Sequence, residues 1–136
     1  MYETFDHTAD LGLRIRAASL ELLLADAGRG LFAMIVPDLD SVELRESLTL
    51  EVAGEANELL LFDWLNELLY VYETRRVLLA GFDVKVDADG LQATVRGEPI
   101  DAARHVLDHE VKAITYHGLK LVHHADGWLG EVIVDI

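Results

Sequence analysis

Hydrophobic positions recur along this chain with two different spacings, and each spacing predicts one kind of element. Apolar residues that alternate with polar ones predict strands, because successive strand side chains point to opposite faces of a sheet. Apolar residues three and four positions apart predict helices with one buried face. We therefore expect strands at residues 2–7, 11–17, 42–52, 82–86, 91–95, 119–123 and 128–134, and helices at 20–36 and 57–73.

Polar and helix-breaking residues set the boundaries of these elements. Ser19 and Asn57 are predicted helix N-caps, and Pro37 blocks continuation of the first helix beyond residue 36. The strand at 42–52 is expected to bend near residues 46 and 47. Asp89-Gly90 predicts a tight turn between two strands of a hairpin.

Two segments do not fit a single period. Gly97-Glu98-Pro99 is expected to break the strand pattern before it. Residues 101–117 are compatible with a strand, since apolar residues alternate near the end of this range, or with a helix. We favour the helix, because Gly118 stands where a helix C-terminal stop is usually found.

The order of the predicted elements favours an α+β fold made of one domain spanning residues 1–136. Its architecture is expected to be a mixed or antiparallel β-sheet packed with two or three α-helices. The chain is 51% hydrophobic with a mean hydropathy of +0.21, which excludes a disordered chain. No linker or repeat divides it.

Charge and composition narrow the classes of partner. The 25 acidic and 11 basic residues give a net charge of −14, which argues against strong direct binding to nucleic acid, because phosphate contacts need Lys and Arg. The charge fits a basic protein surface or a cation, and it also serves solubility alone. The chain contains no cysteine, no signal-peptide pattern and no apolar run long enough for a membrane, which is compatible with the cytoplasm.

Carboxylates near both ends of the chain are the first candidates for chemistry. Asp10 directly precedes one predicted strand, and Asp135 and the terminal carboxylate of Ile136 directly follow another. If these strands lie side by side, three carboxylates share one pocket and need a hard divalent cation such as calcium, magnesium or manganese. The competing interpretation is that Asp10 stabilises a turn and Asp135 is solvated, and the residues alone favour it.

Histidines and a mixed polar segment give weaker signals. His105 and His109 would share a helix face, which suits zinc, but the HExxH pattern is absent, so surface histidines are favoured. The segment 110–117 holds an acid, a lysine, two hydroxyls and an imidazole. One interpretation makes Lys112 and His117 contacts for a partner; the competing one, an ordinary polar surface, is slightly favoured by the residues alone. There is no phosphate-binding loop, dinucleotide fingerprint, nucleophile elbow or cysteine nucleophile.

Taken together, several short segments make this chain resemble the archease family. They run through its whole length in a fixed order: His7-Thr8-Ala9-Asp10 with Leu11-Gly12, Glu58-Leu59-Leu60 with Trp64-Leu65-Asn66, Gly97-Glu98, Glu110-Val111-Lys112-Ala113 with Thr115-Tyr116-His117, and Gly127-Trp128 through Val132-Ile133 to Asp135-Ile136. Each segment alone is weak, but their order and spacing make the resemblance specific.

The resemblance implies a cytoplasmic accessory protein, not itself an enzyme, of the GTP-dependent tRNA-splicing RNA ligase. That ligase takes GMP onto a histidine and joins RNA ends carrying a 2′,3′-cyclic phosphate or 3′-phosphate to a 5′-hydroxyl, and archease-like proteins promote its guanylylation and multiple turnover. The resemblance also implies a divalent metal site, with calcium as the family's metal, at Asp10, Asp135 and Ile136. Two alternatives stay open: a stand-alone metal-dependent phosphoesterase or nuclease, and a chaperone-like protein-binding module.

Overall fold

The architecture comes from a computed structural model that describes residues 1–7 and 10–136. The strands are β1 (Tyr2–His7), β2 (Asp10–Ala17), β3 (Glu46–Ala53), β4 (Val77–Asp87), β5 (Gly90–Pro99), β6 (Ala113–His124) and β7 (Gly127–Asp135). The helices are α1 (Leu20–Ile35), α2 (Glu58–Arg75) and the short 3-10 helix η1 (Leu39–Ser41). Residues 8 and 9, between the first two predicted strands, lie outside the described residues.

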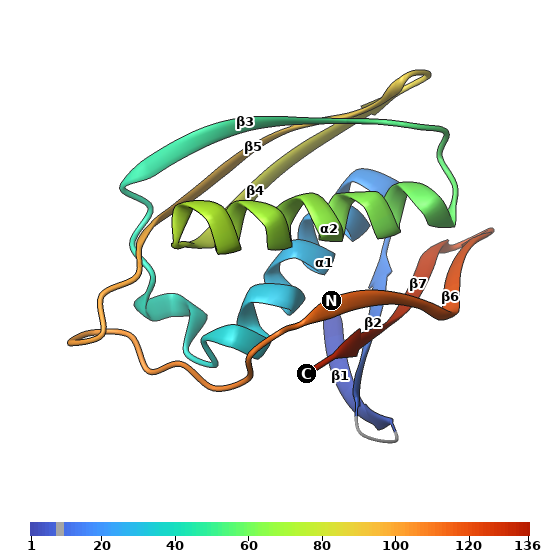
Figure 1. The fold of residues 1–136 in the computed structure, drawn as a ribbon. Coiled ribbons are helices and arrows are strands. Elements are labelled where there is room, and N and C mark those ends of the chain that lie inside the picture. Colours follow the sequence, from blue (N-terminus) through green and yellow to red (C-terminus); the bar gives the residue numbers. More distant parts are fainter. Residues whose placement is uncertain (8–9) are drawn as a thin grey trace.

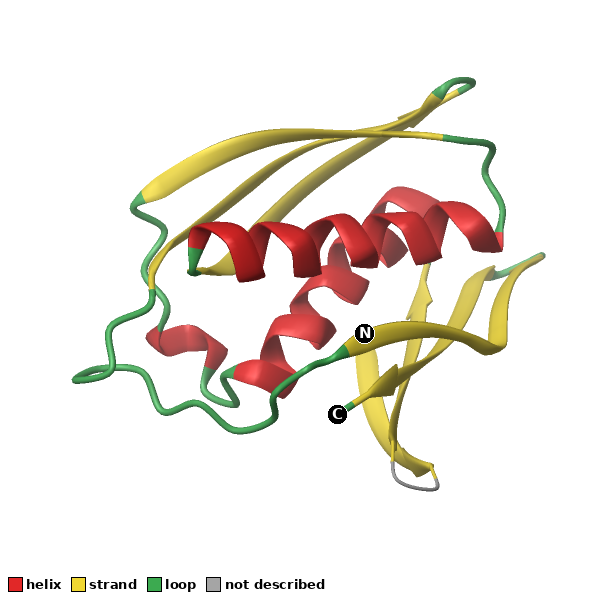
Figure 2. Ribbon diagram, viewed as in Figure 1, coloured by secondary structure: helices red, strands yellow, loops and turns green. Residues whose placement is uncertain are grey.

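The strands form two antiparallel sheets with the helices between them (Figures 1 and 2). One sheet has the order β1-β2-β7-β6 and the other has the order β3-β5-β4. The chain therefore brings its second and last strands together, because β2 pairs with β7 across most of both. This arrangement confirms the predicted α+β fold with an antiparallel sheet, and it resolves the predicted single sheet into two.

The core lies where the helices meet both sheets. Trp64 of α2 is fully buried, and its indole Nε1 donates a hydrogen bond of 2.8 Å to the Leu24 carbonyl of α1. Phe32 of α1 packs edge-on against Tyr72 at a centroid distance of 6.0 Å. These aromatic side chains and the many aliphatic residues of the helices and both sheets form one buried core, and its burial drives the packing of the layers.

The predicted helix boundaries are confirmed. The Ser19 hydroxyl accepts a hydrogen bond from the Leu22 N–H, and the Asn57 side chain accepts one from the Leu59 N–H, so each satisfies an N–H that has no partner within its helix. Helix α1 ends at Ile35, two residues before Pro37. None of the helices in the described residues is long and apolar enough to cross a membrane.

The helix predicted at residues 101–117 is wrong. Residues 100–112 form a long connection without regular structure, and Ala113 begins strand β6. The N–H groups of Asp108 and His109 donate to the Ile35 and Met34 carbonyls at the end of α1, at 2.8 and 3.1 Å. Those N–H groups are therefore not available for a local helix. Gly118 has a φ of 67° and lies in the stretch where the β6–β7 register shifts, so it marks an irregularity in a strand and not a helix end.

Two strand boundaries also differ from the prediction. Gly97-Glu98-Pro99 does not break the pattern but completes β5. A side chain at Gly97 would place its Cβ 1.8 Å from the Leu78 carbonyl oxygen, so the close approach of β4 requires glycine there. The strand expected from residue 42 starts at Glu46, because the Glu43 N–H donates to the Glu98 side chain.

Candidate carboxylate site

The predicted carboxylates meet at one end of the two central strands of the four-stranded sheet. Strands β2 and β7 run antiparallel, and their register places Asp10 directly opposite Asp135. Residues opposite each other in an antiparallel pair project to the same face, with Cβ atoms about 5 Å apart. Ile136 follows Asp135 at once, so the two ends of the sequence bring their acidic residues to one place (Figure 1).

On its other side, Asp135 is flanked by the start of β6 and by the connection that leads into β6. Ala113 is opposite Asp135 on β6, and the Lys112 N–H donates a hydrogen bond of 2.8 Å to the Asp135 carbonyl. Asp135 is therefore held on both sides by main-chain pairing. The sheet register therefore sets the position of the Asp135 side chain. An unpaired, flexible chain end would not hold it in place.

An open hollow of about 730 Å³ lies beside Asp10 and Ile136. Its lining is mainly polar and acidic: Asp6, Asp10, Leu11, Asp108, His109, Glu110, Lys112 and Ile136. Four of these eight residues are carboxylates, and Lys112 is the only lysine or arginine among them. An aqueous hollow with this charge attracts cations or a basic surface.

The described side chains supply only part of the set of ligands that a hard cation needs. Among the described residues, no group of three or more His, Cys, Asp or Glu side chains is placed to hold a metal ion. Asp10 and Asp135 are opposed carboxylates, and Asp10 and Ile136 line the hollow, whereas Asp135 is not among its lining residues. Two carboxylates opposed on neighbouring strands repel, and an oxygen-preferring cation relieves that repulsion.

The two further predicted residues are separated by the structure. Lys112 is exposed and lines the hollow. His117 is exposed on β6, in the stretch where pairing to β7 is interrupted, and is not among the residues that line the hollow. His117 follows Tyr116, whose ring stacks on Phe62 of α2 at a centroid distance of 4.0 Å. These residues belong to two neighbouring parts of the surface.

The histidine pair predicted at 105 and 109 does not share a face. His105 is fully enclosed, against the expectation of a surface histidine, and His109 is partly exposed at the hollow. The His105 Nδ1 accepts a hydrogen bond of 2.9 Å from the Asp101 N–H, so its Nε2 donates to Glu98 at 3.0 Å. These two bonds select the neutral tautomer with hydrogen on Nε2.

Glu98 is the buried acid that the sequence reading missed. It is 2% exposed, and its carboxylate accepts hydrogen bonds from the Glu43 N–H at 2.6 Å, from His105 and from Arg104. Burial acts most strongly and raises the pKa of Glu98, but these three donors together outweigh it and lower the pKa below its ordinary value of 4.5. The sequence feature that indicates this buried acid is its position between Gly97 and Pro99, with a histidine seven residues later.

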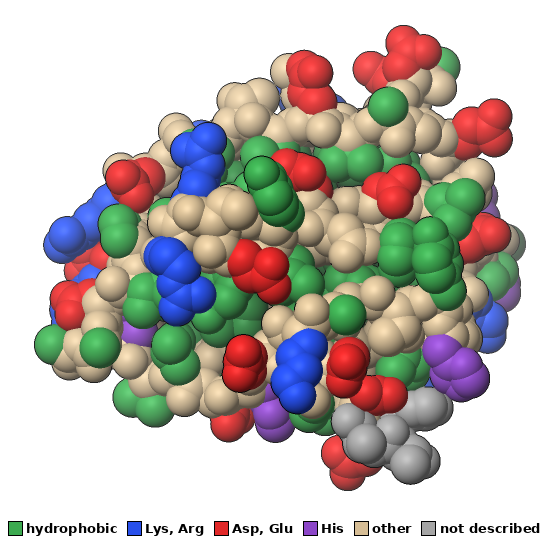
Figure 3. All heavy atoms as spheres, in the orientation of Figure 1, with side chains coloured by type: hydrophobic (Ala, Val, Ile, Leu, Met, Phe, Trp, Pro, Cys, Tyr) green, Lys and Arg blue, Asp and Glu red, His purple; other side chains and the backbone are tan. Residues whose placement is uncertain are grey.

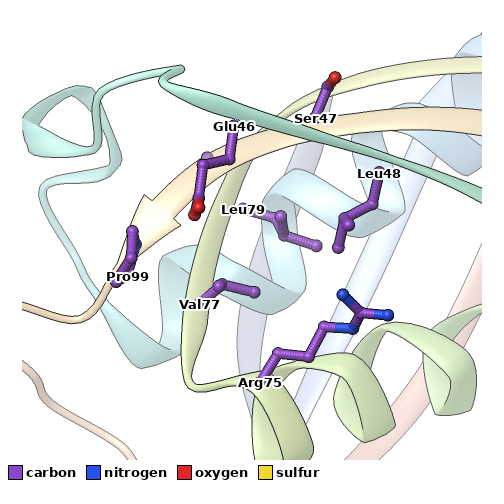
Figure 4. A pocket seen from close by; sticks show the side chains of 8 residues that line it. Glu46, Ser47, Leu48, Arg75, Val77, Leu79 and Pro99 are labelled. Carbon is purple, nitrogen blue, oxygen red and sulfur yellow. The ribbon is translucent and has the colours of Figure 1, made fainter.

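A second hollow lies at the other sheet and shares no residue with the first. It occupies the space between β3, β4 and the end of α2, and Figure 4 shows Arg75 reaching from α2 toward Leu48 across it. Its walls are largely apolar, with Glu46 near Pro99 at the far end (Figure 4).

Elsewhere on the face shown in Figure 3, acidic side chains are scattered and do not gather into one patch.

Comparison with known proteins agrees with this architecture. The model of the archease protein family (MTH1598/TM1083) matches residues 2–136. The chain is 37% identical to protein archease of Methanopyrus kandleri, with 99% of each chain covered, and 36% identical to protein archease of Pyrococcus abyssi, with 99% of this chain and 98% of the relative covered. The solution structure of Methanobacterium thermoautotrophicum protein 1598 superposes with a TM-score of 0.85 at 33% identity, covering 99% of this chain and 98% of that one. The chain therefore belongs to the archease family.

Proposed function

We propose that this protein is an accessory factor of the GTP-dependent tRNA-splicing RNA ligase, and that it promotes guanylylation and multiple turnover of that ligase without being an enzyme itself. The observation that carries the proposal is the pairing of Asp10 with Asp135 in a chain that belongs to the archease family. The register places two carboxylates opposite each other at one end of the two central strands of the sheet.

We further propose that Asp10, Asp135 and a main-chain oxygen of Ile136 hold a divalent cation, with calcium as the family's metal and magnesium or manganese as alternatives. The donors are all oxygen, which such ions prefer. When bound, the ion supplies positive charge able to orient phosphate oxygens or to share ligands with metals of the partner. The role of this chain is to fix the carboxylates, through the sheet pairing of Asp10 and the Lys112 N–H bond to Asp135.

The net charge of −14 supports a protein partner with a basic cleft, such as a cleft that binds RNA and nucleotide. Opposite charges on two proteins raise the rate at which they meet. The negative charge of this protein also disfavours non-productive contacts with nucleic acid, which is negatively charged as well. Lys112, exposed at the rim of the hollow, lies where it can contact the same partner.

Multiple-turnover ligation by the cognate ligase tests this function, with the wild type, Asp10→Asn and a control, Asp83→Asn. Asp83 is an exposed carboxylate of β4, on the other sheet, so its variant loses the same charge away from the site. We expect the wild type and Asp83→Asn to stimulate turnover equally and Asp10→Asn to lose most of the stimulation.

Equal stimulation by a folded Asp10→Asn protein would rule out the carboxylate site. Hydrolysis of RNA or of a phosphoester by the protein alone with Mg²⁺ or Mn²⁺ would favour the phosphoesterase alternative. Binding to many unrelated unfolded proteins, independent of Asp10, would favour the chaperone-like one.

A further inference from the structure

The connection between β5 and β6 is long and irregular, yet it is fastened at several points. The segment 105–112, which we call the anchored loop, begins at the fully buried His105 and ends at Lys112, whose N–H bonds the Asp135 carbonyl at 2.8 Å. Figure 1 shows this connection, in orange, passing below the end of α1 on its way to β6.

The first anchor is a buried polar network. His105 donates to Glu98 at 3.0 Å and accepts from the Asp101 N–H at 2.9 Å, and Arg104 also bonds Glu98. Each of these groups is satisfied by another, so releasing the loop would leave a buried carboxylate without its donors. The start of the loop is therefore costly to move.

The second anchor is the C-terminus of α1. The last carbonyls of a helix have no partner within it, and here the Asp108 and His109 N–H groups bond the Ile35 and Met34 carbonyls at 2.8 and 3.1 Å. Val111 is 3% exposed and gives the loop a third attachment, in the core. The loop is thus tied down before and after residues 106 and 107.

Between the first two anchors, two apolar side chains face the solvent. Val106 is 80% exposed and Leu107 is 43% exposed, so both present apolar surface to water, which is unfavourable unless a partner covers it. Immediately after them, Asp108, His109 and Glu110 line the acidic hollow. A rigid apolar pair next to an acidic hollow matches the anatomy of a protein interface, with an apolar anchor and a polar surround.

We infer that the anchored loop is a preorganised docking element for the ligase, with Val106 and Leu107 entering an apolar pocket of that partner while its basic cleft covers the carboxylate hollow. This inference rests on the proposed function. The commitment to one partner follows from continuity, because residues 108–110 belong to the hollow and residues 106–107 directly precede them. Fixing the loop beforehand lowers the entropy lost on binding.

The test measures the dissociation constant for the cognate ligase by calorimetry, separately from its turnover. The double variant Val106→Asp with Leu107→Asp removes both apolar anchors. Its matched control is Leu22→Asp, which alters a 57%-exposed leucine in the first turn of α1, at the opposite end of the helix from Met34 and Ile35. That helix has 16 residues, so its two ends lie about 24 Å apart.

We expect the double variant to weaken ligase binding at least tenfold and Leu22→Asp to leave it within twofold. We expect Asp10→Asn to lose stimulation, since it alters the proposed metal site and not the apolar anchors. A double variant that binds like the wild type would overturn the docking loop and leave the proposed function intact. No binding by the wild type would overturn both.

Rigidity is tested with His105→Gln, which retains a donor toward Glu98 but loses the Nδ1 acceptor of the Asp101 N–H. We expect faster amide exchange at Asp108 and His109 and about fivefold weaker ligase binding, at temperatures where the protein stays folded. Trp64→Phe, which removes a core hydrogen bond away from the loop, is the control for general destabilisation. Equal effects of both variants on binding would show that the loop's anchoring is not what matters.

Discussion

Replacing Glu98 with glutamine should be among the most destabilising single changes at a polar position of this protein. The carboxylate is 2% exposed and accepts from the Glu43 N–H, His105 and Arg104. Glutamine keeps one acceptor oxygen, and its NH₂ group would face one of these donors. The variant therefore loses charge-assisted bonds and leaves a buried donor without an acceptor.

The magnitude follows from the contacts. Each hydrogen bond to a charged group contributes about 1.5–3 kcal/mol, and removing one partner of a buried ionic pair costs about 3–5 kcal/mol. The Arg104 side chain is 38% exposed, so water screens its share. We expect Glu98→Gln to lower the free energy of unfolding by about 3 kcal/mol, which corresponds to a decrease of about 10 °C in Tm for a chain of this size.

The pH dependence gives a second, independent signature. Because the pKa of Glu98 is lowered in the folded protein, its contribution to stability is complete above its ordinary value of 4.5 and is lost as the pH falls through the folded pKa. The difference between wild type and Glu98→Gln should stay constant at neutral pH and narrow below about pH 4.5.

Urea unfolding followed by circular dichroism at several pH values measures both quantities. Glu51→Gln is the control, since Glu51 is an exposed carboxylate of β3. A cost below 0.5 kcal/mol, or a difference that does not narrow on acidification, would refute the account of Glu98 as a charged, hydrogen-bonded buried group.

Three further predictions concern the metal, the core and a strand contact. Calcium at a large excess over its dissociation constant should raise Tm of the wild type and not that of Asp135→Asn, as measured by calorimetry, because only the folded protein pairs Asp135 with Asp10. Trp64→Phe should cost about 2–3 kcal/mol in urea unfolding, since it removes the bond to the Leu24 carbonyl and leaves a small cavity. Gly97→Ala should cost about 3 kcal/mol or give little folded protein, because its Cβ would meet a β4 carbonyl oxygen at 1.8 Å, and a variant with unchanged Tm would contradict that contact.

The sequence by itself determined a helix or strand wherever the hydrophobic positions fitted only one of the two spacings. The pattern 20–36 gave a helix because its apolar face, the Ser19 cap and Pro37 agree, and the same holds for α2 with Asn57. The Asp89-Gly90 turn and the alternation on both sides of it gave the β4–β5 hairpin, because all of its contacts are close in sequence. The resemblance to archeases added the pairing of the two chain ends that no local pattern contains.

Tertiary structure alone decided the rest. The connection 101–112 has no helix because the N–H groups of Asp108 and His109 bond carbonyls of α1, more than 70 residues earlier. Local sequence does not reveal such a long-range contact. Glu98 is buried because His105, Arg104 and the Glu43 N–H surround it in space. Asp10 lies opposite Asp135 because of sheet register, a long-range property that local spacing does not set.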